Sequence, residues 1–368
     1  MVRALVTAGY SVDVICLRRS GEPKNQVVDG ANIYEISLDR KFGSLVRYIF
    51  EYGMFTLLAL FRATTKMIQR NYRVVQVCNL PDTLIFAALG PKVLGARILF
   101  DAHDCTPEAL MLQKGLNAKS FWVRLAVWME QLALAIADGA VTASDVFKNL
   151  FIQRGACPDK ISVIMNLPDL SVFFPKPANR NGFKSKEFVL VYAGTIAPRY
   201  GLQTAIRALP MLSDIPGLRL RIIGPGNYSA DLLRIAEDLG VIGQVSIEEP
   251  VPYERIIQVY HEADVGICIS TGGLFGTLGF STKVAEYMAC GLPVIVSRVS
   301  AFARYYVDSQ VSFCEPDDPV SFANCVRQLY ANPDYARKLS NNGLQWAKTM
   351  NWQGESERYL DIVRRLYK

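Results

Sequence analysis

The sequence contains very little histidine and no cysteine pattern typical of a metal site. Among 368 residues there are two histidines, and the eight cysteines are dispersed without any CxxC spacing. Structural zinc sites need about four such ligands at short spacing, so these counts argue against one. Several cysteines lie in apolar runs such as VDVIC and ADVGICIS. Dispersed, buried thiols indicate a reducing compartment, and we expect a cytoplasmic protein.

Long apolar runs and long charged runs are also missing. No apolar stretch approaches the ~18–20 residues of a membrane-spanning helix, and the first residues do not resemble a signal peptide. The net charge is +6 without a lysine- or arginine-rich tail, which argues against a nucleic-acid partner. Internal repeats and low-complexity tracts are not visible either.

Short β-branched runs alternating with amphipathic stretches make up most of the chain. Half of the residues are hydrophobic and a fifth are charged, as in a folded globular protein. Buried strands that alternate with helices predict parallel sheets covered on both faces. The expected strands cover residues 11–16, 74–77, 97–100, 139–142, 161–164, 188–192, 218–223, 245–247, 265–269 and 293–296.

Two doubly wound α/β domains are the simplest architecture for this length. The stretch PKPANRNGFKSK, residues 175–186, lacks periodicity and indicates a linker. We therefore expect a first Rossmann-like domain over 1–174 and a second over 187–352, facing a cleft. A last helix over 353–368 is expected to cross back to the first domain.

The beginning of the chain departs from the usual doubly wound pattern. MVRALVTAGYSVDVIC predicts the end of a helix, a C-capping Gly9 and then a strand. A doubly wound domain normally opens with a strand and a glycine-rich turn. We therefore expect the first domain to lack its usual first strand.

Two glycine-bearing loops follow strands in the second half. In EFVLVYAGTIAPRYGLQTAIRAL, a strand ends at Gly194 and Thr195, and the next loop carries Arg199. LRLRIIGPGNYSADLL repeats the design with Gly224 and Gly226. Such loops offer backbone N–H groups to a phosphate, and arginine adds a bidentate charge. The alternative is a pair of ordinary strand–helix turns.

The segment STKVAEYMACGLPVIVS predicts a helix that starts near Ser281. Lys283 and Glu286 are three residues apart and lie on neighbouring parts of one face. Lysine suits a phosphate, and glutamate suits the hydroxyls of a ribose. The alternative is a weak intrahelical ion pair worth ~0.3–0.5 kcal/mol. Upstream, TGGLFGTLGF is glycine-rich and nearly free of charge, as expected of a loop close to a ligand.

In the first half, ARILFDAHDCTPEAL places Asp101, His103 and Asp104 directly after a buried strand. Sites collect at the carboxyl ends of strands, and a histidine between aspartates can hydrogen-bond a sugar or move a proton. The alternative is a turn in which an aspartate caps the next helix. His261, in QVYHEADVG, is expected to be structural.

Residues 40–73 combine aromatic and apolar residues with seven cations and a single anion, Glu51. The cations are Arg40, Lys41, Arg47, Arg62, Lys66, Arg70 and Arg73. A basic amphipathic stretch of this kind can lie on an anionic membrane surface. The alternative is a core helix with a basic solvent face.

With these segments in place, the chain resembles a retaining glycosyltransferase of family 4 with the two-domain GT-B fold. The markers appear in order as FDAHDCTPE, ADGAVTASDVFKNLF, KISVIMNLPD, VYAGTIAPRYGLQTAIRAL, IIGPGN, VPYERIIQVYHEADVGICIS and STKVAEYMACGLPVIVS. Their order and spacing extend over nearly the whole chain.

The resemblance implies a role for each matching residue. Glu286 would bind the ribose of a nucleotide-sugar donor, Arg199 and Lys283 would face the diphosphate, and His103 would contact the sugar. It also implies a metal-independent reaction without cofactors. The expected catalytic residues are His103, Arg199 and Lys283. The expected nucleotide-sugar-binding residues are Gly194, Thr195, Arg199, Gly224, Ser281, Thr282, Lys283 and Glu286.

Two positions depart from the pattern of many relatives. Leu278 stands where a relative often carries another glutamate, and Tyr200 stands where a basic residue often precedes the loop glycine. A subgroup with a Lys-x-x-Glu-Tyr pattern resembles this chain more closely.

We therefore expect transfer of a sugar from a UDP- or GDP-sugar to an acceptor hydroxyl, with retention of configuration. A lipid-linked glycan intermediate of cell-surface polysaccharide is the expected acceptor. A peripheral position on the inner membrane face would follow from residues 40–73. Two alternatives stay open, namely a nucleotide-sugar 2-epimerase of the same architecture and a non-catalytic nucleotide-sugar-binding subunit.

Overall fold

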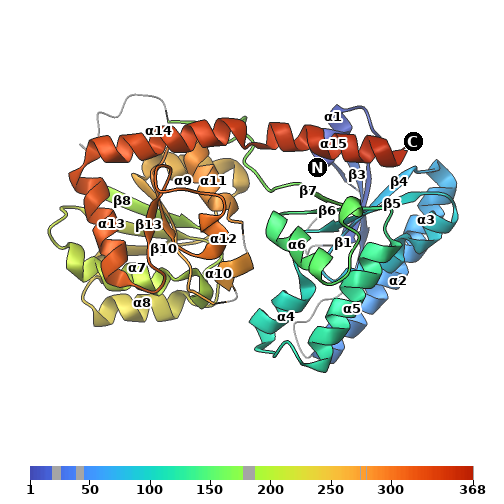
Figure 1. The fold of residues 1–368 in the computed structure, drawn as a ribbon, viewed down its shortest axis with the longest axis horizontal. Coiled ribbons are helices and arrows are strands. Elements are labelled where there is room, and N and C mark those ends of the chain that lie inside the picture. Colours follow the sequence, from blue (N-terminus) through green and yellow to red (C-terminus); the bar gives the residue numbers. More distant parts are fainter. Residues whose placement is uncertain (19–25, 39–44, 177–186, 274, 279, 368) are drawn as a thin grey trace. The chain divides into compact units, whose positions relative to one another are not determined.

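The computed structural model describes residues 1–18, 26–38, 45–176, 187–273, 275–278 and 280–367, and Figure 1 shows the order of its elements. Its backbone divides into two compact units. Unit 1 comprises Met1–Met165 together with Glu355–Lys368, and unit 2 comprises Asn166–Gly354. The chain thus passes from unit 1 into unit 2 and returns with its last helix.

Unit 2 is built on one parallel sheet of six strands in the order β10-β9-β8-β11-β12-β13. Strands β8, β11 and β12 are buried along their whole length, so they form continuous apolar runs in the sequence. The strands are β8 (Phe188–Ala193), β9 (Leu218–Ile223), β10 (Val245–Glu248), β11 (Val265–Cys268), β12 (Val294–Ser297) and β13 (Ser312–Cys314).

Helices cover both faces of this sheet. Successive residues of β8 show it: Leu190 and Tyr192 belong to one buried cluster, and Val189 and Val191 belong to the other. The helices are α7 (Leu202–Ala208), α8 (Ser229–Asp238), α9 (Ile256–Glu262), α10 (Phe275–Leu278), α11 (Thr282–Ala289), α12 (Ser300–Ala303), α13 (Pro319–Ala331) and α14 (Pro333–Thr349). Short 3₁₀ turns are η3 (Pro198–Tyr200), η4 (Leu209–Leu212), η5 (Ile242–Gln244) and η6 (Tyr253–Arg255).

Unit 1 contains two separate sheets. A parallel sheet has the order β4-β5-β6-β7, and a smaller one has the order β1-β3-β2, with β1 and β3 parallel and β2 antiparallel. The strands are β1 (Asp13–Leu17), β2 (Val27–Val28), β3 (Ala31–Ile36), β4 (Val74–Cys78), β5 (Arg97–Ala102), β6 (Gly139–Thr142) and β7 (Ile161–Val163).

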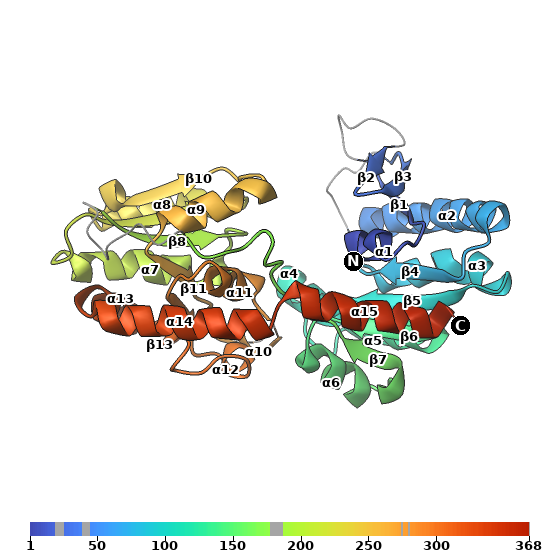
Figure 2. The same ribbon diagram turned by 90° about the horizontal axis from the view of Figure 1, so that it is seen from above.

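A long helix, α2, packs against β1 and β3 on one side and against η1 and α3 on the other (Figure 2). The helical elements of unit 1 are α1 (Val2–Thr7), α2 (Leu45–Arg70), η1 (Asp82–Ala88), α3 (Leu89–Val93), α4 (Thr106–Lys114), α5 (Phe121–Ile136), α6 (Asp145–Gln153), η2 (Pro158–Lys160) and α15 (Trp352–Tyr367). Among the residues that the structure describes, no helix has the length and apolarity needed to cross a bilayer.

The ten strands expected from the sequence are all present, and the two doubly wound units confirm the fold class. Gly9 follows α1 at φ +87° and precedes β1, in the predicted order. Three strands were not predicted. β2 and β13 have two and three residues, and β3 carries Asn32 and Glu35 within an otherwise apolar run. Pairing with a neighbouring strand, and not local pattern, fixes such strands.

The boundary between the units differs from the prediction at residue 174. Residues that follow Asn166 already pack on unit 2, because Phe173 is fully buried beside the ring of Tyr260. The side chain of Gln353 donates to Asp169 at 2.7 Å, which ties the same segment to the start of α15. Of the predicted linker, residues 177–186 lie outside the described part of the chain.

Candidate functional site

Two glycine loops lie side by side at the carboxyl ends of β8 and β9. A Cβ on Gly224 would come within 2.0 Å of the Gly194 carbonyl oxygen, and one on Gly226 would come within 2.0 Å of the Ile196 oxygen. The loops are also joined by hydrogen bonds from Gly194 N to Ile223 O and from Ile196 N to Pro225 O, both 2.8 Å. Only glycine permits this approach, so the paired loops form one rigid rim of exposed backbone.

Lys283, on α11, extends across the first of these loops. A Cβ on Gly194 would lie 2.1 Å from the Lys283 Cε, and the φ of +149° at this glycine also disfavours a side chain. The glycine therefore leaves the space through which the lysine reaches the end of β8. The structure brings these two predicted residues into direct contact.

The Lys283 ammonium lies over two tyrosine rings. Its Nζ is 5.3 Å from the centre of the Tyr192 ring and 5.0 Å from that of Tyr200. The negative ring faces attract the cation without neutralising it. Among the described residues, Lys283 forms no ion pair. Glu286, one turn further along α11, is not paired with it either.

Arg199 is fixed by its backbone and its guanidinium is held on Tyr200. Its carbonyl oxygen accepts from Thr271 N at 3.1 Å, from the Thr271 hydroxyl at 3.2 Å and from the Ser270 hydroxyl at 3.4 Å. The guanidinium carbon lies 4.8 Å from the centre of the Tyr200 ring. One ring therefore carries the arginine and the lysine together, which places two positive charges at the end of β8.

Glu286 points to a different neighbour from Lys283. Its Oε2 accepts a hydrogen bond of 2.8 Å from the Tyr260 hydroxyl. Burial raises the pKa of Glu286, while the Tyr260 hydrogen bond and the nearby Lys283 charge act in the opposite direction. The carboxylate is thus held in place by a donor that leaves its other oxygen available for a ligand.

Helix α11 starts where the sequence predicts, directly after Ser281. Ser281 is the N-cap of the helix, but its side chain makes no capping hydrogen bond. Its hydroxyl lies 3.1 Å from the Cys268 sulfur at the end of β11. Thr282 is the first helical residue and is partly exposed. Thr195 is exposed, and its carbonyl accepts from the Tyr192 hydroxyl at 2.7 Å.

Residues around this cluster were not singled out from the sequence. Four of them contact the predicted residues. Tyr192 lies under Lys283, Tyr260 donates to Glu286, and Ser270 and Thr271 donate to the Arg199 carbonyl. Ser270 and Thr271 follow β11, and this position near the carboxyl end of a strand could have marked them as site residues in the sequence. Leu278 ends the short helix α10 and is partly exposed.

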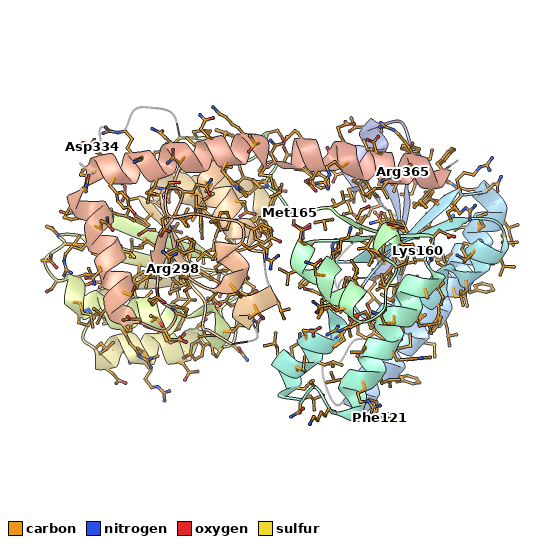
Figure 3. All side chains as sticks on the ribbon, viewed as in Figure 1. Phe121, Lys160, Met165, Arg298, Asp334 and Arg365 are labelled. Carbon is orange, nitrogen blue, oxygen red and sulfur yellow. The ribbon has the colours of Figure 1, made fainter. Side chains whose placement is uncertain are left out.

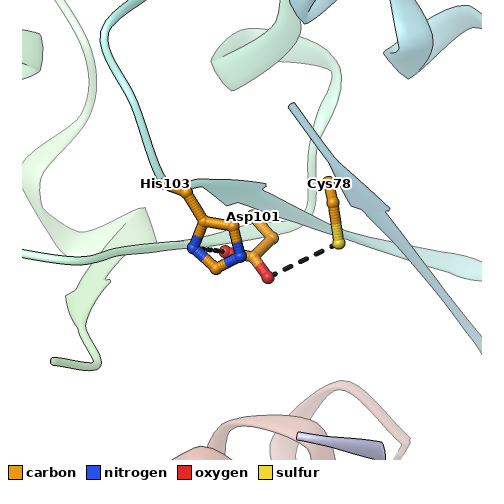
Figure 4. A group of neighbouring side chains, drawn as sticks. All are labelled: Cys78, Asp101 and His103. Atoms are coloured by element: carbon orange, nitrogen blue, oxygen red, sulfur yellow. Dashed lines mark hydrogen bonds and ion pairs between the residues drawn. The ribbon is translucent and has the colours of Figure 1, made fainter. Parts of the chain in front are cut away.

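In unit 1, His103 follows β5 and lies beside Asp101 and Cys78, as Figure 4 shows. Its Nδ1 is 3.1 Å from Asp101 Oδ1, and the Cys78 sulfur is 3.6 Å from Oδ2. Asp101 is fully buried, and this burial raises its pKa. Desolvation and the neighbouring Asp101 charge raise the pKa of Cys78 to about 12.

Asp101 is connected to the last helix of the chain. Gln76 donates to Asp101 Oδ2 at 2.6 Å, and the Tyr359 hydroxyl of α15 donates to the Gln76 oxygen. Gln76, supported by Tyr359, therefore holds the Asp101 carboxylate that faces His103. Asp104 does not cap the next helix, because the N-cap of α4 is Cys105 and no side-chain capping bond is present.

A second polar cluster lies deeper in unit 1. Arg154 pairs with Glu130 at 2.9 Å and with Glu108 through its other terminal nitrogen. Burial raises the pKa of Glu130 to about 7, although Arg154 opposes the shift. Cys105 lies close to the two acids, and the guanidinium already occupies the position between them. This arrangement suits an internal ion-pair network better than a ligand site.

His261 has the structural role expected of it. Its Nε2 lies 2.8 Å from the Phe174 carbonyl oxygen, and its ring packs edge-on against the Phe174 ring. Lys176 donates to the His261 carbonyl oxygen. These contacts fasten residues 174–176 to α9.

Comparison with known proteins gives matches over almost the whole chain. Residues 1–172 match the family model described as Glycosyltransferase Family 4, and residues 174–346 match the one described as Glycosyl transferases group 1. The D-inositol 3-phosphate glycosyltransferase of Thermomonospora curvata is 25% identical over 255 residues, covering 63% of this chain and 58% of the relative. The matched region thus spans little more than half the length of such relatives.

A further relative is a GDP-mannose-dependent α-(1-6)-phosphatidylinositol monomannoside mannosyltransferase of Mycolicibacterium smegmatis. It is 31% identical over 169 residues, which are 45% of this chain and 44% of the relative. Sucrose-phosphate synthase from Thermosynechococcus elongatus superposes with a TM-score of 0.74 at 18% identity, covering 99% of this chain and 91% of that one. The structure of Anabaena Alr3699/HepE in complex with UDP and glucose superposes with a TM-score of 0.72 at 16% identity. The match covers 91% of this chain and 87% of that one. At these identities the structural likenesses establish the fold.

Proposed function

This chain belongs to the family 4 glycosyltransferases, and we propose on that basis that it transfers a sugar from a nucleotide-diphosphate sugar to an acceptor hydroxyl, with retention of configuration. The observation that carries the proposal is the convergence of Lys283 and Arg199 on the Tyr200 ring, with Lys283 also in contact with Gly194 at the end of β8. Two cations beside exposed backbone suit a diphosphate better than any neutral ligand.

Lys283 and Arg199 would stabilise the diphosphate as it leaves. Negative charge develops on the leaving oxygens in the transition state, and preorganised cations lower the energy of that state without a metal. The Tyr200 ring holds both cations in place before the donor binds. We therefore propose a metal-independent reaction.

Glu286 would accept hydrogen bonds from the ribose diol. The Tyr260 hydroxyl orients its carboxylate and occupies one oxygen. His103 would contact the transferred sugar from unit 1, with Asp101 beside its Nδ1. A UDP-sugar or GDP-sugar fits this set, since Anabaena Alr3699/HepE is in complex with UDP-glucose and the Mycolicibacterium relative is named as GDP-mannose-dependent.

The acceptor is proposed to be a lipid-linked glycan intermediate of cell-surface polysaccharide, met at the inner face of the membrane. Support comes from α2, which exposes an apolar stripe at helical spacing, with Phe50 and Phe61 67% and 75% exposed. Relatives differ in acceptor, because one is named for D-inositol 3-phosphate and another for a phosphatidylinositol mannoside.

Nucleotide binding tests the assignment of the site. We expect UDP or GDP, and their sugars, to raise the unfolding temperature of the protein, because a ligand that binds only the folded state stabilises it. Glu286→Ala should weaken nucleotide binding measured by calorimetry, whereas Glu237→Ala, at an exposed position of α8, should not. Full donor affinity in Glu286→Ala would overturn the ribose assignment.

Turnover tests the reaction itself. Donor with a mixture of lipid-linked acceptors should give a glycoside whose anomeric configuration, read by NMR, matches that of the donor. Donor incubated alone should stay intact. An epimer and free UDP in that control would instead identify a 2-epimerase, and tight UDP binding without any turnover would identify a non-catalytic subunit.

A further inference from the structure

Helix α5 (Phe121–Ile136) exposes large apolar side chains on one face. Phe121, Trp122, Leu125 and Trp128 are 69%, 40%, 37% and 58% exposed. Phe121, Leu125 and Trp128 recur at helical spacing, and the rings of Phe121 and Trp122 pack edge-on at 5.4 Å. Figure 3 places Phe121 at the outer end of the helix, on the periphery of unit 1. We call these four residues the aromatic face.

The opposite face of α5 already forms the core of unit 1. It packs against η1 and α4 through buried side chains. These are Val123, Ala126, Glu130, Ala133 and Leu134. The aromatic face is therefore surplus to the fold, and it holds two of the four tryptophans of the chain. Large exposed apolar patches of this kind mark interaction surfaces.

The chain segment that carries the aromatic face has charge of one sign. Residues 109–129 contain no aspartate or glutamate, but they contain Lys114, Lys119 and Arg124. All three are exposed, and none forms an ion pair with another residue in the part of the chain that the structure describes. A cationic rim around tryptophan and phenylalanine matches the interface of an anionic bilayer, where amphipathic rings and basic side chains both lie at headgroup depth.

Helix α2, the basic stretch recognised from the sequence, presents its cations differently. Arg62 donates to the Glu35 carbonyl at 2.9 Å, Lys66 lies 3.8 Å from the centre of the Tyr34 ring, and Arg70 is 3.5 Å from Asp13. These cations face the small sheet of unit 1. Cations with no such internal partner surround α5 instead.

We propose that the aromatic face of α5, with Lys119 and Arg124, binds the surface of an anionic lipid bilayer. This inference deepens the proposed function, because a lipid-linked acceptor gives the contact its purpose, although bilayer binding itself needs no turnover. Pairing of two copies through this face is disfavoured, since it would bring cations of like charge together. An anionic bilayer surface buries the aromatic rings and pairs with the cations at the same depth.

Vesicle sedimentation tests the proposal with the full chain. Wild-type protein should bind vesicles that contain phosphatidylglycerol more tightly than vesicles of phosphatidylcholine alone. Trp122→Ser/Trp128→Ser should weaken that binding by about tenfold or more, since a buried aromatic side chain contributes at least that much. Lys119→Glu/Arg124→Glu should weaken it by at least about fivefold per charge. The matched control Val307→Ser/Val320→Ser removes two exposed apolar side chains of unit 2 and should leave vesicle binding nearly unchanged.

Tryptophan fluorescence gives an independent readout. Brominated lipids should quench a larger fraction of the wild-type emission than of the emission of Trp122→Phe/Trp128→Phe, because the variant lacks the two tryptophans of the aromatic face. Equal affinity for the two kinds of vesicle, or undiminished binding by the serine variant, would overturn the proposal. A dimer that the serine variant converts to a monomer in light scattering would assign the face to a second copy. Each variant should keep its thermal shift with UDP or GDP, which separates this test from that of the proposed function.

Discussion

The two units surround their charged side chains in opposite ways. In unit 2, Lys283 and Arg199 rest on tyrosine rings beside glycine backbone. In unit 1, the acids Asp101 and Glu130 are buried, and burial raises the pKa of each. A ring attracts a cation without cancelling its charge, whereas a buried carboxyl binds a proton or an internal partner.

This difference indicates what each cluster can do. Lys283, which forms no ion pair among the described residues, remains able to bind an incoming anion. Buried acids with internal partners mainly position other groups, as Asp101 does for His103, or join elements, as Glu130 does through Arg154. Variants should therefore affect ligand binding in unit 2 and stability or positioning in unit 1.

Lys283→Ala should have the largest effect on activity. Loss of one preorganised charge at a leaving group costs about 10²–10³ in turnover, or ~3–4 kcal/mol. The free energy of unfolding should change by less than ~1 kcal/mol, because Lys283 has no ion pair among the described residues. Steady-state kinetics and urea unfolding measure the two quantities. Lys338→Ala, at an exposed position of α14, is the control. Equal turnover in the two variants would show that Lys283 does not stabilise the leaving group.

Glu130→Gln should alter the free energy of unfolding and its pH dependence. The expected change is smaller than the loss of transition-state stabilisation in Lys283→Ala. The pKa of Glu130 is raised to about 7 in the folded protein, from 4.5. The folded state therefore binds the extra proton, and its stability falls as the pH rises from 4.5 through 7. We expect the wild-type free energy of unfolding to fall by about 2–3 kcal/mol more than that of the variant between these values.

Thermal unfolding at several pH values measures this slope. Asp159→Asn, at an exposed position of unit 1, should keep the wild-type slope. Parallel curves for wild type and Glu130→Gln would show that the carboxyl titrates equally in both states. Nucleotide affinity at fixed pH should stay constant, because the nucleotide-binding residues belong to unit 2.

Tyr200→Leu should have the smallest effect of the three variants, and the effect should be on UDP affinity. It removes the ring that holds Arg199 and Lys283, a contribution of ~0.5–2 kcal/mol, and should weaken UDP binding by about threefold to tenfold. Tyr200→Phe keeps the ring and should bind nearly as wild type. The diphosphate contribution, read as the UDP to UMP affinity ratio in calorimetry, should fall only in the leucine variant. An unchanged ratio would show that the ring does not position the cations.

Much of the fold could be predicted because its signals are local. β-branched runs such as VYAGT and VIVS must be buried on both faces, and that burial leads directly to parallel sheets with helices on each side. The boundary at Met165 could not be predicted, because packing of Phe173 against Tyr260 decides it. A three-residue strand such as β13 is likewise fixed by its neighbour.

The sequence suggested which residues make up the candidate site, and the structure adds which atoms those residues contact. Gly194, Lys283 and Glu286 were identified from spacing, yet Tyr200 was noted only as a departure from the family pattern. Ser281 stands at the predicted start of α11, but its hydroxyl lies against Cys268 and makes no capping hydrogen bond. The cations of α2 were counted as a basic surface, and the structure shows several of them bound to the small sheet.

The sequence by itself determined two parallel α/β units, the glycine loops and the positions of the charged residues, because periodicity and glycine placement act over a few residues. Only the tertiary structure decided where those charges point. Lys283 and Glu286 are neighbours on α11, but one reaches Gly194 and the other Tyr260. Partners from distant strands and helices set those directions, since a side chain follows the lowest-energy contact that the folded chain brings within reach.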